Sequence, residues 1–294
     1  MMDRISRLLR RVWRAGADFA DVTDRRHIFL LSAGIAFNQL LCLIPFVLVA
    51  IGVASSVLDE TTTKASVRSV IEGLLPEGVV ATEAIASVLN EIGIVFNYGT
   101  LAGWIAGVVL IWTASALYSA LRSGLNAIYS IPTPKFFLIY RLKDILLVMM
   151  TVLLLIVATF VSPVLSAFEA ASTTVLEAEA RSVVFGLTAR VISLIVTTVL
   201  FLFLYRFVPN GRMPRPVVLY STGFAVLLWE GARLLFAWYI ANASSLGTFY
   251  GGYVALASIA LWAYYSSLVF LIAAELGQFV HERYGSRLWG QKRK

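Results

Sequence analysis

Few side chains in this sequence could do chemistry, and most of them lie within long apolar stretches. Glu230 and Arg233 are three residues apart in one such stretch, a spacing that places both on one face of a helix. Charge at bilayer depth costs free energy and usually faces protein or a water-filled cavity. The pair therefore either lines a substrate path or forms an ion pair that locks this segment to a neighbour.

Two amides and a second carboxylate are further candidates for a substrate path. Asn38 and Gln39 precede Pro45 in the first apolar stretch. Such amides either bond between helices, which we favour, or line a cavity beside a kink. Pro45 is a candidate hinge because it removes a backbone donor. Glu275 lies nearer the end of its stretch, where snorkelling towards the head groups is the commoner explanation.

The usual signatures of enzymes are missing from the sequence. It contains no nucleotide-binding loop, no zinc-protease motif and no serine-hydrolase elbow. One cysteine, Cys42, and two histidines argue against a disulfide or a zinc site. We therefore expect no enzyme activity, no catalytic residue, no metal and no cofactor. The net charge of +7 is distributed between apolar stretches, so we also expect no nucleic-acid partner.

Composition indicates that the bilayer solvates most of this chain. Hydrophobic residues make up 59% of the sequence and charged residues 14%, whereas soluble domains carry about 25% charged residues. Six apolar stretches each provide the roughly 20 residues that cross a bilayer core. The predicted fold is an all-α, polytopic membrane helical bundle in a domain of residues 28–279, with six transmembrane helices at about 28–57, 97–121, 143–167, 183–207, 217–241 and 250–279.

The basic residues predict which way the chain threads. Nineteen Lys and Arg residues fall in four segments (1–27, 122–143, 206–215 and 281–294), and three fall in the other connections. Cytoplasmic loops are enriched in Lys and Arg. We therefore expect both termini in the cytoplasm.

Three flanking segments have patterns of their own. Residues 1–27 are predicted to form a basic amphipathic helix on the cytoplasmic side, which would contact anionic head groups of membrane lipids; a solvated tail is the alternative. In the first outer loop, 58–96, apolar residues recur at helical spacing and predict two short amphipathic helices. Residues 280–294 are predicted to form a basic cytoplasmic tail.

Glycines mark two further features. Gly99, Gly103 and Gly107 form a stripe of small residues that favours close helix packing, either within the chain, which we favour, or in a homo-oligomer. The segment 246–252 is glycine-rich and joins the last two predicted spans. A tight turn is the default interpretation, and a gate at Gly247, Tyr250 and Gly251 is the alternative.

Several motifs, in order, resemble the YihY/BrkB family of bacterial inner-membrane proteins over roughly residues 20–285. The first is AFNQLLCLIP at 36–45, in which Cys42 and the Asn38–Gln39 pair depart from the family pattern. The others are Trp112 with Asn126 and Tyr129, then YRFVP at 205–209, followed by Phe236, Tyr239, Tyr250-Gly251, Trp262 and Ala274-Glu275.

The resemblance implies a six-span protein, with some members linked by name to virulence and others once labelled ribonuclease BN. We expect a transporter or exporter of a lipid-like or amphiphilic envelope substrate. A non-transporting membrane scaffold is the alternative. A membrane-associated ribonuclease is disfavoured, because the cytoplasmic segments carry few carboxylates beyond the N-terminal one.

Overall fold

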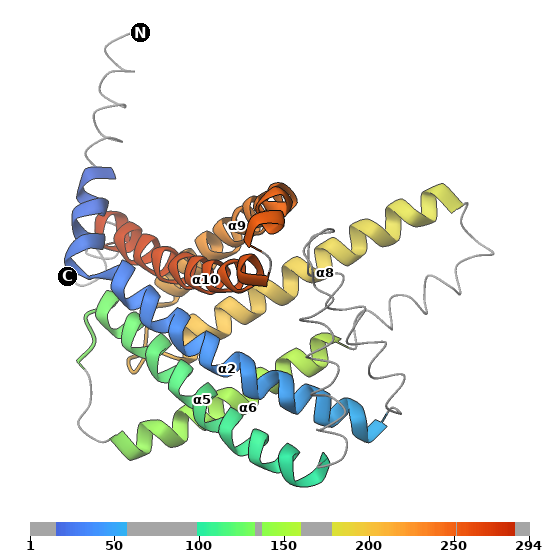
Figure 1. Cartoon of the computed structure of the whole chain (residues 1–294). Coiled ribbons are helices and arrows are strands. Elements are labelled where there is room, and N and C mark those ends of the chain that lie inside the picture. The colour runs from blue at the N-terminus through green and yellow to red at the C-terminus, as the bar shows by residue number, and fades with distance from the viewer. Residues whose placement is uncertain (1–15, 58–98, 133–136, 160–177, 251, 286–294) are drawn as a thin grey trace. The chain divides into compact units, whose positions relative to one another are not determined.

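Long α-helices make up most of the computed structural model, which describes residues 16–57, 99–132, 137–159, 178–250 and 252–285. Residues 16–25 are helical, and α10 continues into a short π-helix, η2 (His281–Gly285). Within these ranges the structure contains no strand, so the all-α prediction is confirmed. The long helices are α2 (Ile28–Val57), α5 (Gly99–Ile128), α6 (Phe137–Thr159), α8 (Ala178–Phe207), α9 (Arg215–Tyr250) and α10 (Gly252–Val280) (Figure 1).

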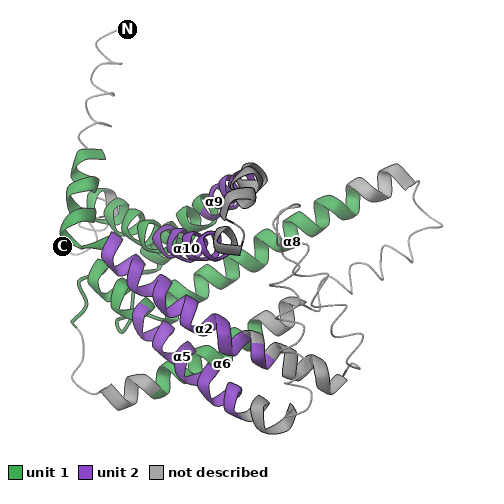
Figure 2. Cartoon of the chain, viewed as in Figure 1, with its two compact units in different colours: residues 1–28, 121–228, 270–294 green, residues 29–120, 229–269 purple. Residues whose placement is uncertain are grey.

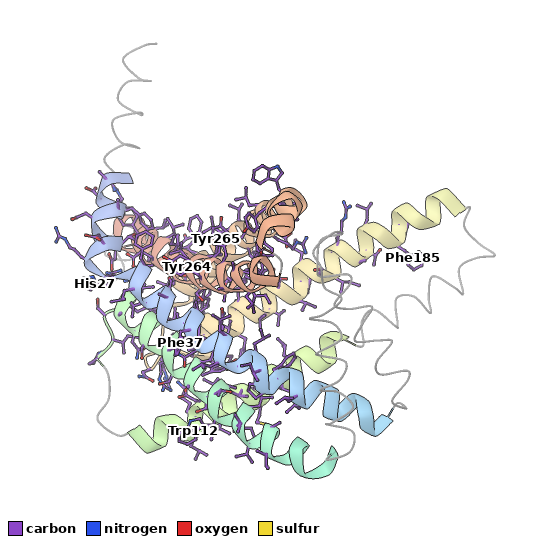
Figure 3. All side chains as sticks on the ribbon, viewed as in Figure 1. His27, Phe37, Trp112, Phe185, Tyr264 and Tyr265 are labelled. Carbon is purple, nitrogen blue, oxygen red and sulfur yellow. The ribbon has the colours of Figure 1, made fainter. Side chains whose placement is uncertain are left out.

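Five of these helices are long and apolar enough to cross a membrane. α6 is not among them within the described residues, so the count of six spans and the orientation remain predictions. Phe37 and Trp112 are 61% and 70% exposed, and large aliphatic side chains on the same helices are exposed as well (Figure 3). So much exposed apolar surface is characteristic of a protein in contact with lipid. The five candidate segments are Ile28–Phe46, Ile105–Ile128, Val184–Phe207, Arg215–Tyr239 and Leu256–Arg283.

Local chemistry explains why α5 runs seven residues past its predicted end. Ser130 has a φ of 54°, in the left-handed region that usually follows a helix. The amide of Ile131 donates to the carbonyl of Asn126 at 2.9 Å, and the amide of Ser130 donates to that of Ala127 at 3.4 Å. This bond pair is a Schellman motif, and Pro132 follows it. The helix therefore ends where its last carbonyls are satisfied, beyond the most apolar residues.

The chain divides into two compact units, each built from segments distant in sequence (Figure 2). Unit 1 comprises residues 1–28, 121–228 and 270–294. Unit 2 comprises residues 29–120 and 229–269. Helices α5, α9 and α10 each contribute residues to both units.

The core of unit 1 joins α8, α9 and α10. The ring of Tyr205 stacks on that of Phe270 at 4.9 Å between centroids, and its hydroxyl donates to the Phe270 carbonyl at 2.8 Å. A Cβ added to Gly277 would lie 2.6 Å from the backbone nitrogen of Ser221 and 2.8 Å from its Cα. Only glycine therefore permits this contact between α9 and α10.

The predicted packing stripe on α5 does not show such a contact at its third position. A Cβ added to Gly107 would meet no described atom within 4 Å, so close intrachain packing along the stripe stays a prediction. Gly99 and Gly103 lie in the first turns of α5, and their surroundings are outside the described residues. Also outside are residues 1–15, the two helices expected in 58–96, and the tail from 286 onward.

Candidate functional site

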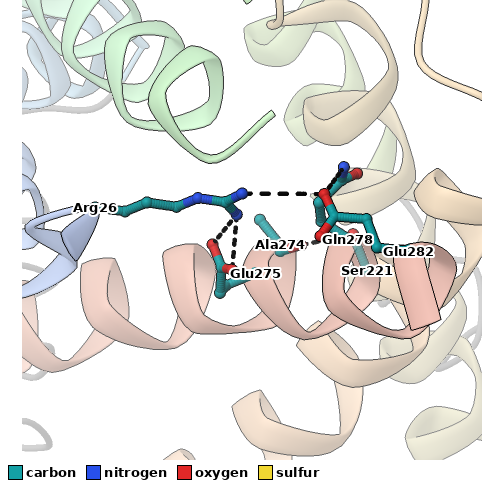
Figure 4. A network of polar contacts seen from close by, with 6 residues as sticks. All are labelled: Arg26, Ser221, Ala274, Glu275, Gln278 and Glu282. Atoms are coloured by element: carbon teal, nitrogen blue, oxygen red, sulfur yellow. Dashed lines mark hydrogen bonds and ion pairs between the residues drawn. The ribbon is translucent and has the colours of Figure 1, made fainter. Parts of the chain in front are cut away.

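A buried ion pair anchors the N-terminal segment of unit 1 to α10. Both carboxylate oxygens of Glu275 accept from Nη1 of Arg26 at 2.7 Å (Figure 4). Nη2 of Arg26 lies 4.0 Å from Oε1 of Glu282, which also accepts from Nε2 of Gln278 at 2.6 Å. Glu275 is 1% exposed, so the snorkelling explanation is wrong. A buried carboxylate needs a partner, and Arg26 supplies it.

The turn before α2 places Arg26 at this carboxylate. His27 has a φ of 52°, which interrupts the helical backbone between residues 16–25 and α2. Two further contacts hold the segment against α10 and η2. The rings of Phe19 and Phe279 meet edge-on at 5.8 Å, and Arg283 lies 3.3 Å from Asp18.

A second buried ion pair joins the end of α5 to the start of α6, also in unit 1. Nη2 of Arg122 donates to Oδ2 of Asp144 at 2.7 Å, and Nη1 pairs with Oδ1. Both side chains are buried. Sequence reasoning treated Arg122 as one of many topology-determining charges and missed the pair. The available signal was Asp144 itself, an acidic residue beside a basic loop.

The connection from α8 to α9 is fixed by hydrogen bonds in the same unit. Oδ1 of Asn126 accepts from the amide of Asn210 at 3.2 Å, and Lys143 donates to the Pro209 carbonyl at 3.2 Å. Asn126 is thus a hydrogen-bonding residue near the end of α5. Its partner lies in another loop, which the sequence did not indicate.

Tyr129 adds a neutral polar contact at the end of α5. Its hydroxyl lies 3.3 Å from Oγ of Ser221, which donates to the Ala274 carbonyl at 3.4 Å. Burial raises the pKa of Tyr129, so the phenol stays protonated at physiological pH. The ion pairs and hydrogen bonds described for unit 1 thus connect segments that are distant in the sequence.

Unit 2 contains the predicted path residues of the first span. Oε1 of Gln39 accepts from Ser266 at 3.4 Å and from Ser267 at 3.3 Å, so the bond between helices predicted for Gln39 is confirmed. Nδ2 of Asn38 instead donates to the carbonyl of Gly34, on its own helix, at 2.8 Å. The carbonyl one turn back lies within reach of its short side chain, and a bond from Asn38 to another helix stays a prediction.

The charged pair on α9 lies in unit 2 as well. Nη2 of Arg233 is 2.8 Å from Oε2 of Glu230. The side chains are 57% and 31% exposed, respectively. Among the described residues, neither side chain forms an ion pair or hydrogen bond with another helix. Unlike Glu275, which is almost wholly buried, both side chains retain exposure, although they belong to a helix that can cross a membrane.

Aromatic rings from α9 and α10 pack together near this pair in the sequence. Trp262 lies 5.3 Å from Trp229 and 4.6 Å from Phe236, between ring centroids. Tyr239 stacks beside Phe236 at 6.0 Å. Because residues three and four apart are neighbours on a helix, Trp229 and Phe236 flank Arg233 on the surface of α9.

The hinge and gate candidates lie within helices or at their ends. Pro45 lies inside α2 and is buried. Gly247 and Tyr250 lie in the last turn of α9, and residue 251, outside the described residues, separates α9 from α10. A tight turn was predicted to begin at residue 246, but α9 continues to Tyr250, so this part of the prediction is wrong. Residues 246–250 contain no proline and one glycine, Gly247, and a single glycine costs a helix only about 1 kcal/mol.

No group of three metal-ligating side chains gathers within the part of the chain that the structure describes. The described residues combine paired charges and hydrogen-bonding side chains with long apolar helices. These features define a polytopic α-helical membrane protein.

The comparison with known families agrees with this class. The model of the virulence factor BrkB family matches residues 19–294, so the chain belongs to that family. The resemblance inferred from the motifs is thereby confirmed. No solved structure matches the chain.

Three relatives with curated sequences are named as UPF0761 membrane proteins. The UPF0761 membrane protein VP0125 of Vibrio parahaemolyticus is 26% identical over 82% of this chain and 74% of its own length. A UPF0761 membrane protein of Chlorobium luteolum is 26% identical over 91% of this chain and 62% of its own length. One from Alkalilimnicola ehrlichii is 38% identical over 35% of this chain, and the match spans only 23% of that relative.

Proposed function

We propose that this protein is an inner-membrane transporter or exporter of a lipid-like, amphiphilic envelope substrate. It would cross the membrane six times, with both termini in the cytoplasm. The observation that carries the proposal is the Glu230–Arg233 pair, in which Arg233 is exposed and Glu230 half-buried on a helix that can span a bilayer. The Arg26–Glu275 pair is much less exposed, so it is better explained as a structural contact than as a binding site.

The physical argument concerns what solvates the charges. Hydrocarbon does not solvate a carboxylate or a guanidinium, and charges inside membrane spans usually face protein or a water-filled cavity. Glu230 and Arg233 partly neutralise each other, yet much of Arg233 remains uncovered. A path that admits water and polar head groups would satisfy the rest of both side chains.

The amides of α2 and the aromatic cluster suit the same role. Gln39 bonds to Ser266 and Ser267 through its oxygen, and its Nε2 has no partner among the described residues. An amphiphile needs both polar contacts and apolar surface, which Trp229, Phe236 and Trp262 provide. With no nucleotide-binding motif in the sequence, a concentration gradient, an ion gradient or a partner would supply the energy.

Reconstitution into liposomes tests the proposal. The purified chain is incorporated into vesicles containing a fluorescent phospholipid, and dithionite reports how much probe moves to the outer leaflet. We expect faster movement than in protein-free vesicles. Glu230→Gln and Arg233→Gln should slow it severalfold, while Arg212→Gln, at an exposed loop position, should leave it unchanged.

The same experiment separates transport from scaffolding. Folded, monodisperse protein that moves neither phospholipid nor single-chain amphiphile, with both α9 variants silent, would overturn the proposal. That result would favour the scaffold.

A further inference from the structure

We propose that the Glu230–Arg233 pair binds a zwitterionic amphiphile, one whose head group carries a phosphate and an ammonium. This inference rests on the proposed function and specifies its substrate class. It follows from the balance of charge at the pair, the atoms that the pair leaves unengaged, and the aromatic rings beside it.

The balance of charge excludes two simpler ligand classes. The pair is neutral as a unit. An anionic head group would pair with Arg233 but would repel Glu230, and a cationic one would do the reverse. Each would leave one unbalanced charge at a depth where charge is costly. A zwitterion supplies a partner for both side chains, and the assembly stays neutral.

The contact between the two side chains leaves atoms available for such a ligand. The 2.8 Å contact uses Nη2 of Arg233 and Oε2 of Glu230. Among the described residues, the remaining guanidinium N–H groups and Oε1 of Glu230 engage no other side chain. A guanidinium binds phosphate oxygens through paired N–H groups, and a carboxylate accepts from an ammonium. The ligand can therefore bind before the internal pair opens.

The aromatic residues beside the pair favour an ammonium with apolar neighbours. Trp229 and Phe236 lie one turn to either side of Arg233 on α9, and Trp262 of α10 packs against both rings. Tryptophan faces attract alkylated ammonium groups, and the same rings offer surface to an acyl chain. The combination fits a choline- or ethanolamine-type head group with its attached chain.

Three single-chain probes of equal length distinguish the charge classes: dodecylphosphocholine, dodecyl phosphate and dodecyltrimethylammonium. Binding to the full chain in a nonionic maltoside detergent is measured by native mass spectrometry. We expect the wild type to bind the phosphocholine about five-fold more tightly than either charged probe, the size that one partly exposed ion pair can contribute.

The variants make reciprocal predictions. Glu230→Gln should shift preference to dodecyl phosphate, and Arg233→Gln should shift it to dodecyltrimethylammonium. The double variant should lose discrimination among the three probes. Exchanging the two residues, Glu230→Arg with Arg233→Glu, should restore preference for the zwitterion. The restoration shows that charge complementarity sets selectivity, and it also controls for misfolding.

Equal binding of the three probes by the wild type, or single variants that shift in the same direction, would overturn the inference. The liposome assay remains a separate result. If the variants show reciprocal selectivity but no lipid moves, the transport proposal fails and the ligand class is supported. If lipid moves without reciprocal selectivity, transport is supported and the zwitterionic ligand class is rejected.

Discussion

Nη1 of Arg26 lies 2.7 Å from both carboxylate oxygens of Glu275, a residue 249 positions later in the chain. The contact joins the segment before the first span to the last long helix. Because Glu275 is almost wholly buried while Arg26 retains some exposure, the two partners should not contribute equally to stability.

Arg26→Gln should be the more damaging of the two single substitutions. It leaves a buried carboxylate without its partner, which costs about 3–5 kcal/mol. Glu275→Gln leaves an arginine that can reach solvent or Glu282, so its cost should be smaller. Thermal unfolding in detergent measures both, and the double variant should recover part of the loss. Arg25→Gln is the matched control, since its pair with Asp21 is exposed and contributes less than about 1 kcal/mol.

The Arg122–Asp144 pair predicts strong non-additivity. Replacing either partner alone with an apolar residue, as in Arg122→Met or Asp144→Leu, should destabilise unit 1 by about 3–5 kcal/mol, because the remaining buried charge loses this ion pair. The double variant should be close to wild type, because no charge then remains to be desolvated. Additive losses in a double-mutant cycle would show that the side chains do not depend on one another.

Gly277→Ala should destabilise the protein although alanine is the better helix former. Its Cβ would meet backbone atoms of Ser221 at 2.6 and 2.8 Å, so α9 and α10 would have to separate, at a cost of about 1–3 kcal/mol. Gly223→Ala on α9 is the control, because a Cβ there meets no described atom within 4 Å. That change should be neutral or raise the unfolding temperature. Equal effects at the two glycines would contradict the close approach.

Cysteine labelling tests the predicted threading. In a Cys42→Ser background, a single cysteine at position 130 should react with a membrane-impermeant maleimide only after the inner face is exposed. A cysteine at position 64 should react in intact cells. Labelling of both positions from the same side would contradict six spans with both termini inside.

The sequence predicted the helices well because their signal is local. A bilayer imposes length and apolarity on each span separately, so the first predicted span coincides with α2 from Ile28 to Val57. The last begins and ends within two residues of α10. Helix ends that depend on capping were predicted less well. Ser130, in a conformation that glycine usually adopts, gave no warning in the sequence.

Partnerships between distant residues could not be predicted in the same way. A buried glutamate and a snorkelling one cannot be distinguished in the sequence unless the partner charge is known. Arg26 was interpreted only as one of the seven basic residues in 1–27 that mark the cytoplasmic side. The glycine stripe on α5 illustrates the converse. Gly107 has the right spacing but no close neighbour in the described part of the chain, whereas the isolated Gly277 makes the tight contact.

The left-handed backbone at His27 restricts which residues can occupy position 27. This conformation costs most residues about 1–2 kcal/mol, and glycine, asparagine and aspartate adopt it more readily. A β-branched residue at this position would favour uninterrupted helix through the junction and carry the guanidinium of Arg26 round to another face. Tolerance at residue 27 is thus set by the ion pair that its neighbour Arg26 makes with Glu275.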